Sequence, residues 1–118
     1  LIKAQRIQEK AANAGFDWEE RAQVWDKVKE EISEVDAEAI AGNSEALESE
    51  FGDLFFSLVN AARLYGITPE NALEKTNKKF IRRFSHIETE TAEAGKKLNE
   101  LTLAEMDKLW NEAKKLEK

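Results

Sequence analysis

Glycine and proline divide this sequence into segments of helical length, and this spacing constrains the fold more than any other feature. The chain contains one proline and five glycines in 118 residues. Glycine commonly ends helices and proline commonly starts them, so these residues mark helix boundaries. No segment alternates apolar and polar residues with the period of two that a half-buried strand requires. The sequence therefore predicts an all-α fold, a helical bundle of about five helices.

The predicted boundaries combine these glycines with capping residues that precede each helix. Asp or Thr followed three residues later by Glu forms a capping box, and Thr before proline is also a strong start signal. Glycines are expected to end the first four helices, at Gly15, Gly42, Gly66 and Gly95. The predicted helices run from Leu1 to Ala14, from a capping box at Asp17 and Glu20 to about Ala41, from the capping residue Ser44 to Tyr65, from Thr68-Pro69 to around Gly95, and from a capping box at Thr102 and Glu105 through Trp110.

The overall charge and the absence of cysteine exclude several classes of function. The formal net charge is −6, which argues against general nucleic-acid coating but leaves anionic substrates open where a metal or a local basic patch reverses the sign. Without cysteine, neither a disulfide framework nor a thiolate metal site can form. No apolar run approaches the roughly 20 residues that span a bilayer, and no signal peptide is visible. We expect a cytoplasmic protein without a membrane or nucleic-acid partner.

Two short acidic segments carry the strongest functional signal. Glu31 and Glu34 lie three residues apart in the first, and Glu50 and Asp53 lie three residues apart in the second. Residues three apart share one face of a helix, so two adjacent helices would bring four carboxylates together. Like charges about 5 Å apart repel by about 3 kcal/mol at an effective dielectric near 20, so convergence requires a cation. Oxygen-only ligands suit Mg²⁺, with Mn²⁺ as the alternative. On spacing alone, a solvated acidic surface is an equally good interpretation.

The helical phase places these carboxylates beside the predicted apolar faces rather than on them. At 100° per residue, Glu31 and Glu34 flank the apolar face of their helix, and four polar residues follow one edge of the next helix. The predicted apolar faces are Val24, Val28, Ile32, Val35 and Ala39, then Leu47, Phe51, Leu54, Leu58 and Ala62, then Phe80, Phe84 and Ile87, and the polar edge is Glu50, Asp53, Ser57 and Asn60.

Several longer motifs resemble one known family. In chain order, they resemble the C-terminal catalytic domain of the MazG family of nucleotide pyrophosphohydrolases across essentially the whole chain. The acidic pattern alone is shared with dUTPases and phosphoribosyl-ATP pyrophosphohydrolases, whereas the last two motifs favour MazG. The motifs are Gly15-Phe16-Asp17-Trp18, Gly52-Asp53-Leu54-Phe55, Val59-Asn60-Ala61-Ala62-Arg63, the segment from Asn77 to Phe84, and the segment from Leu109 to Lys114.

The resemblance implies an Mg²⁺-dependent hydrolysis of a nucleoside triphosphate to the monophosphate and diphosphate, in which a metal-activated water attacks the α-phosphate. It also implies a fold of the all-α NTP pyrophosphohydrolase type, active as a homodimer. The chain is then one catalytic domain, 1–118, which in many members is one of two tandem domains. At matching positions, the implied metal ligands are Glu31, Glu34, Glu50 and Asp53, and the implied substrate contacts are Lys79, Arg83, Trp110 and Lys114.

Further roles are read from the residues themselves, and they leave alternatives open. Glu30 or Glu34 is the candidate general base, and the sequence does not choose between them. Asn60 lies on the acidic edge, where it either orients a ligand, contacts the sugar or packs as a polar residue. Apart from the resemblance, Trp110 fits a core position better than a base-stacking one.

Two other functions compete with this interpretation. One is a narrower relative, such as a dUTP or phosphoribosyl-ATP pyrophosphohydrolase. The other is a non-catalytic nucleotide-binding dimerisation module, against which the intact set of four carboxylates argues.

Trp18 and Trp25 are assigned to packing, and His86, the single histidine, to the surface.

Overall fold

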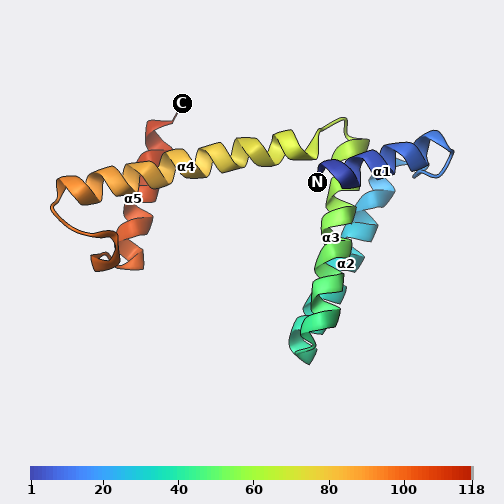
Figure 1. The fold of residues 1–118 in the computed structure, drawn as a ribbon, viewed down its shortest axis with the longest axis horizontal. Coiled ribbons are helices and arrows are strands. Elements are labelled where there is room, and N and C mark those ends of the chain that lie inside the picture. The colour runs from blue at the N-terminus through green and yellow to red at the C-terminus, as the bar shows by residue number, and fades with distance from the viewer. Residues whose placement is uncertain (118) are drawn as a thin grey trace. The chain divides into compact units, whose positions relative to one another are not determined.

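The computed structural model describes residues 1–117, and the regular elements of these residues are all helices (Figure 1). The predicted all-α fold class is confirmed. No helix in this range is both long and apolar enough to cross a membrane. In chain order the elements are α1 (Ile2–Asn13), the short 3₁₀ helix η1 (Arg21–Gln23), α2 (Val24–Ala41), α3 (Ser44–Leu64), α4 (Pro69–Glu93), the short 3₁₀ helix η2 (Leu98–Glu100) and α5 (Leu103–Leu116).

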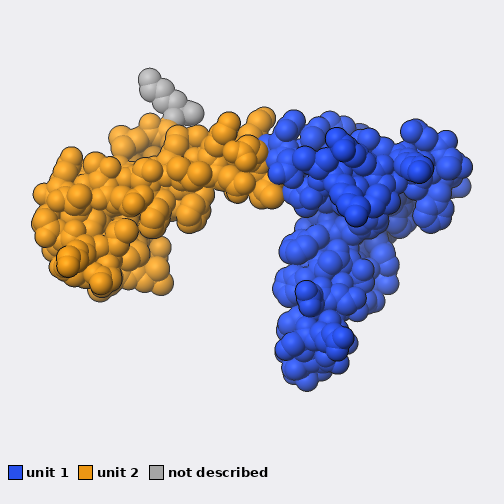
Figure 2. Space-filling view, in the orientation of Figure 1, with its two compact units in different colours: residues 1–72 blue, residues 73–118 orange. Residues whose placement is uncertain are grey.

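The chain divides into two compact units, which Figure 2 distinguishes by colour. Unit 1 spans Leu1–Ala72 and holds α1, η1, α2 and α3. Unit 2 begins at Leu73 and holds most of α4, together with η2 and α5. The first turn of α4 therefore belongs to unit 1, and each unit is described by itself.

Unit 1 is built on α2 and α3, which lie side by side (Figure 1). The two helices are joined by a tight connection in which Gly42 adopts a left-handed conformation, with φ of 75°. Only glycine adopts this conformation without strain, so the chain can reverse directly after α2. The core between the helices contains Val24, Val28 and Ala61, with Leu54 packed against them.

Helix α1 lies against α3 and is joined to it by a polar contact. The Gln8 side chain is 5% exposed, and its Nε2 donates a hydrogen bond of 2.9 Å to the backbone carbonyl of Phe56 in α3. Directly after α3, the hydroxyl of its C-cap residue Tyr65 accepts a 2.9 Å hydrogen bond from Trp25 Nε1 of α2. These contacts connect α1, α2 and α3 into one unit.

In unit 2, α4 and α5 are connected by aromatic and charged contacts. The rings of Phe80 and Trp110 lie 5.2 Å apart, and Ile87 and Ala113 are buried. His86 was predicted to lie on the surface, but its side chain is only 20% exposed, with Nε2 3.6 Å from a Glu112 carboxylate oxygen. The ring is partly covered because it faces Glu112 of α5.

The predicted start of α2 is wrong. Asp17 and Glu20 do not form a capping box; the capping box is formed by Glu20 and Gln23, and it opens η1 rather than α2. The α-helix itself begins at Val24. The carboxylate of Asp17 instead pairs with Arg63 of α3, 46 residues away. This long-range ion pair competes with local capping, so the segment before η1 stays non-helical.

The predicted cap of α3 is shifted by one residue. The side chain of Asn43, not Ser44, accepts the hydrogen bond from the backbone N–H of Ala46, at 3.2 Å. Asparagine and serine are comparable N-caps, so local preference does not distinguish the two residues. The other helix boundaries agree with the predictions, including the start of α4 at Pro69, the capping box of Thr102 and Glu105, and the glycines Gly15, Gly42, Gly66 and Gly95, all with positive φ.

The predicted apolar faces are only partly buried. Ile32 in α2 is 51% exposed, Phe51 and Leu58 in α3 are about two-fifths exposed, and Phe80 in α4 is 57% exposed. Ala39 and Phe84 are also exposed. In α2 and α3 the buried positions include Glu31 and Ser57, so the covered faces are rotated toward the polar edge. The apolar periodicity therefore identifies the helices correctly but only part of their covered faces, which include Val24, Val28 and Ile87.

Candidate metal centre and adjoining cavity

Three of the four predicted metal-ligating carboxylates come together in unit 1. One oxygen atom each from Glu31, Glu50 and Asp53 can be chosen so that all three lie within 4.8 Å of one another. Glu31 is on α2, and Glu50 and Asp53 occupy successive turns of α3. The cluster forms because α2 and α3 lie side by side and because residues three apart share a helix face.

Glu31 is the buried member of this cluster, with only 4% of its surface exposed. Its Oε1 accepts from Lys27 Nζ at 3.0 Å, while its Oε2 is buried without a hydrogen-bond partner. The Glu31 carboxylate raises the pKa of Lys27, chiefly through this hydrogen bond. A buried carboxylate with only one of its two oxygens satisfied is costly, so the second oxygen favours a cationic ligand.

Glu50 shows the effect of crowded negative charge. Its pKa is raised above the ordinary value, first by a hydrogen bond with the Glu34 carboxyl, then by desolvation, and then by the charges of Glu34, Asp53 and Glu31. Its Oε2 is also buried without a partner. Glu34 therefore lies beside the cluster through Glu50, although it is not one of the three residues whose oxygens converge.

This arrangement fits a hard divalent cation. It offers converging carboxylate oxygens, no nitrogen or sulfur ligand among them, and two buried oxygens that lack a partner. Carboxylate oxygens of this kind are the ligands that Mg²⁺ and Mn²⁺ prefer. Glu31, Glu50 and Asp53 would hold such an ion directly, and Glu34 lies next to Glu50 as the fourth predicted ligand.

The remaining predicted acid in unit 1, Glu30, lies on the outside of α2. Its carboxylate is exposed and 3.6 Å from Lys27 Nζ, so Lys27 contacts both Glu30 and Glu31. The 4-residue spacing of Lys27 and Glu31 on one helix is a signal from which this ion pair could have been predicted.

A cavity of about 700 Å³ adjoins the carboxylates. Glu31 and Asp53 form part of its wall, and α1 and the segment after it form another part. Eight of its polar or aromatic lining residues were not among the predicted site residues: Gln8, Phe16, Asp17, Trp18, Lys27, Phe56, Ser57 and Arg63. Trp18 was predicted to pack in the interior, but it lines this cavity with 36% of its surface exposed. Its place in the motif Gly15-Phe16-Asp17-Trp18 was the available signal.

Asn60, a predicted substrate contact, lies in this cavity within a fixed network. Its Oδ1 accepts from Arg63 Nη2 at 2.6 Å and from Nε at 3.2 Å. The same guanidinium donates to both carboxylate oxygens of Asp17, at 2.7 and 3.2 Å. Hydrogen bonding to Arg63 is the main reason that the pKa of Asp17 lies below its ordinary value. The network therefore fixes the orientation of the Asn60 amide.

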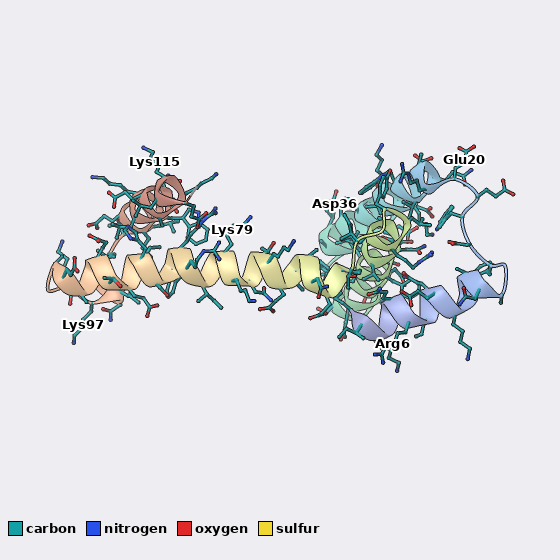
Figure 3. All side chains as sticks on the ribbon, turned by 90° about the horizontal axis from the view of Figure 1, so that it is seen from above. Arg6, Glu20, Asp36, Lys79, Lys97 and Lys115 are labelled. Atoms are coloured by element: carbon teal, nitrogen blue, oxygen red, sulfur yellow. The ribbon has the colours of Figure 1, made fainter. Side chains whose placement is uncertain are left out.

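The predicted substrate contacts in unit 2 surround the end of α5. Lys79, labelled on α4 in Figure 3, and Lys114 on α5 are exposed. Arg83 donates to the Glu117 carboxylate from Nε at 3.1 Å and from Nη2 at 2.9 Å, and its guanidinium lies 5.2 Å from the centre of the Trp110 ring. The Glu117 carboxylate raises the pKa of Arg83, and Arg83 lowers the pKa of Glu117. Trp110 is half-buried and packs against Phe80 within unit 2.

The fold and the carboxylate cluster together define an all-α protein with a candidate divalent-metal centre on adjacent helices. The sequence profile of the MazG nucleotide pyrophosphohydrolase domain matches residues 8–88. The chain therefore belongs to the MazG nucleotide pyrophosphohydrolase family.

Curated relatives agree with this family assignment. The chain is 41% identical to the nucleoside triphosphate pyrophosphohydrolase/pyrophosphatase MazG of Thermotoga maritima, over 97% of this chain and 44% of the relative. It is 43% identical to the nucleoside triphosphate pyrophosphohydrolase of Escherichia coli K12, over 99% of this chain and 45% of the relative. It is also 57% identical to the uncharacterized protein YabN of Bacillus subtilis, over 61% of this chain and 15% of the relative. The chain thus spans less than half the length of the curated relatives that it matches.

Proposed function

We propose that this chain catalyses the hydrolysis of a nucleoside triphosphate to the monophosphate and diphosphate, with Mg²⁺ bound at the carboxylate cluster. The observation that carries the proposal is the convergence of Glu31, Glu50 and Asp53 in a chain of the MazG family. The names of the Thermotoga maritima and Escherichia coli relatives support the same activity. Because the family match runs from residue 8 to residue 88, it includes parts of both units and supports one catalytic domain over 1–118.

The chain's own carboxylates would provide the metal site. Glu31, Glu34, Glu50 and Asp53 would hold the ion, and Mn²⁺ is the alternative to Mg²⁺. When bound, the ion supplies positive charge that offsets both the carboxylates and the triphosphate, and it polarises the phosphoryl oxygens. The unpartnered Oε2 atoms of Glu31 and Glu50 are the specific support for this role.

The reaction breaks the bond between the α-phosphorus and the oxygen that bridges it to the β-phosphorus. A water molecule attacks the α-phosphorus, its proton passes to a carboxylate base, and diphosphate leaves. Glu30 and Glu34 are the candidates for that base. Glu30 is exposed and paired with Lys27, whereas Glu34 contacts Glu50. Glu34 is also a proposed metal ligand, so the test uses Glu30→Gln: if Glu30 is the base, this variant lowers the rate without weakening metal binding, and an unchanged rate leaves Glu34 as the candidate.

Lys79, Arg83 and Lys114 are proposed to bind the triphosphate, with Asn60 and Trp110 at the nucleoside. The support is the match of these positions to the family motifs and the chemistry of the side chains, since cations bind phosphate oxygens and guanidinium groups do so at two points. Arg83 is already held in a two-point contact by Glu117, so its guanidinium is oriented before any substrate binds.

A homodimer is proposed as the active form, and a cytoplasmic location stays a prediction. The support for the dimer is the exposed apolar face of α3, on which Phe51, Phe55 and Leu58 are 41%, 56% and 43% exposed. These residues share one helix face, and a contiguous apolar face is normally covered by a partner. We expect Phe55→Glu to convert a wild-type dimer to a monomer in light scattering coupled to size-exclusion chromatography. A wild-type monomer would contradict the proposal.

Product analysis tests the proposed activity. The purified chain is incubated with each common nucleoside triphosphate, in Mg²⁺ and in EDTA, and the products are separated by ion-exchange chromatography. We expect monophosphate and diphosphate only with metal, and no turnover by Glu50→Ala with its helical circular dichroism unchanged. Nucleoside diphosphate with free phosphate would mean that the bond between the β- and γ-phosphates is cleaved, which contradicts the proposal. Metal-dependent binding without turnover would instead indicate a non-catalytic nucleotide-binding module.

A further inference from the structure

The cavity beside the carboxylates carries an inference about substrate recognition that rests on the proposed function. We infer that this cavity, between α1 and α3, binds the nucleobase of the substrate, with Gln8 and Asn60 as hydrogen-bonding partners and Trp18 as an aromatic wall. All of these residues belong to unit 1.

Gln8 offers a buried acceptor that has no partner within the described residues. Its side chain is 95% buried, lines the cavity, and leaves Oε1 without a hydrogen bond. The orientation of the amide follows from the chemistry of its contact. The Phe56 carbonyl can only accept, so the amide nitrogen must face it and the oxygen must face the other way. A buried acceptor in this position favours a ligand that offers an N–H group.

Asn60 offers the complementary group. Its Oδ1 accepts two hydrogen bonds from Arg63, so this end of the amide is occupied. The network through Asp17 holds Arg63 in place. The Asn60 Nδ2 group, with two hydrogens, is therefore the end left for a ligand acceptor. The cavity thus has both an acceptor and a donor, which is the pairing that the edge of a nucleobase presents.

The remaining walls are aromatic and carry little unpaired positive charge. Phe16, Trp18 and Phe56 line the cavity, and Phe16 is 83% exposed, so aromatic surface is available for a flat ligand. Among the described lining residues, the cations are Lys27 and Arg63, and both are already in ion pairs. A highly charged triphosphate does not suit such a cavity, whereas a neutral base does.

The position and size of the cavity agree with this occupant. Glu31 and Asp53 belong both to the carboxylate cluster and to the cavity wall, so a base in the cavity lies close to the candidate metal centre. A volume of about 700 Å³ lies within the range of roughly 300–1,000 Å³ that is usual for small-molecule sites.

The test compares ligands with and without a base. Calorimetry measures binding of a nucleoside monophosphate and of inorganic tripolyphosphate, with Mg²⁺, to wild type, Gln8→Met and Trp18→Leu. Gln5→Met on α1 and Trp25→Leu on α2 are matched controls, because Gln5 and Trp25 do not line the cavity. We expect Gln8→Met to weaken monophosphate binding about 5-fold and Trp18→Leu about 10-fold, as expected for one hydrogen bond and one stacking contact. Tripolyphosphate binding and the controls are expected to stay at the wild-type level.

A second measurement identifies the hydrogen bond itself. The preferred nucleotide is compared with an analogue whose base lacks the exocyclic amino group or ring N–H on that edge. Wild type should prefer the natural base, and Gln8→Met should lose this preference. Unchanged monophosphate binding by both variants overturns the inference, as does an equal loss for tripolyphosphate. These experiments measure binding rather than turnover, so they test the cavity even if product analysis finds no activity. If turnover is found but neither variant changes monophosphate binding, the inference fails and the proposed activity stands.

Discussion

Replacing Asp53 with asparagine should make the metal-free protein more stable and the metal-bound protein less so. Asp53 contributes negative charge to a cluster in which carboxylate oxygens lie within 4.8 Å of one another. Asparagine has a similar size and helix propensity, so the substitution mainly removes charge. The change in metal-free stability and the change in metal-bound stability have opposite signs, so one variant tests both.

The size of the first effect follows from the geometry. At 4.8 Å and an effective dielectric near 20, the Asp53 and Glu31 charges repel by about 3.5 kcal/mol. Asp53 is exposed, and solvent screening reduces this to about 1 kcal/mol. A change of that size corresponds to a rise of about 4 °C in Tm for a domain of this length.

The second effect follows from linkage between metal binding and folding. At Mg²⁺ concentrations about 100 times Kd, the bound ion stabilises the wild type by about 2.7 kcal/mol, or about 10 °C in Tm. Without the Asp53 carboxylate, we expect less than half of this rise. The assay is thermal unfolding followed by circular dichroism, in EDTA and in a series of Mg²⁺ concentrations.

The control is Asp36→Asn, which removes the same charge from an exposed position on α2, outside the three-carboxylate cluster. This variant should keep both the wild-type Tm in EDTA and the full response to Mg²⁺. The reasoning is refuted if metal-free Asp53→Asn is less stable than wild type, since Asp53 would then be a structural residue. An unchanged response to Mg²⁺ would remove Asp53 from the metal site.

Three further predictions concern other contacts. Arg83→Lys loses the two-point contact with Glu117, so the KM for triphosphates should rise in steady-state assays, and an unchanged KM would remove Arg83 from the substrate site. Arg63 lowers the pKa of Asp17 below 3.8, so this ion pair stabilises the fold above pH 3.8, and the contribution is lost as the pH falls through the folded-state pKa. The Tm difference between wild type and Asp17→Asn should therefore be present at pH 6 and vanish in strong acid. A difference that persists in strong acid would contradict the assignment. Val24 is fully buried, so Val24→Ala should lower the free energy of unfolding by about 2 kcal/mol in urea titrations, and a loss under 0.5 kcal/mol, the usual limit for surface changes, would place it outside the core.

Local signals predicted the helices well because helix boundaries depend on nearby residues. Gly42, Gly66 and Gly95 end helices through their own backbone conformation, and Thr102 caps α5 through a residue three positions away. The start of α2 could not be predicted in the same way. Asp17 has a choice between a local cap and Arg63, and only the folded arrangement of α3 decides it.

The candidate site shows the same division between local and long-range information. The spacing of Glu50 and Asp53 correctly places both on one face of α3. Two adjacent helices were predicted to bring such pairs together, and in the structure the pair on α3 meets Glu31 of α2. The depth of Glu31 was not predictable from helical phase alone, because burial depends on which side of α2 meets α3. The cavity was also missed, since its wall joins Gln8 and Trp18 to residues of α3 that are distant in sequence.

Lys27 gives the metal-free protein an internal counter-ion. Its ammonium group neutralises Glu31 at 3.0 Å and reaches Glu30 at 3.6 Å, so the cluster is never wholly without positive charge. Glu31 keeps its second oxygen, Oε2, without a partner, so the lysine and a divalent ion would each occupy one oxygen of the same carboxylate. Lys27 therefore offsets part of the negative charge of the cluster without occupying the oxygen that is left for a metal.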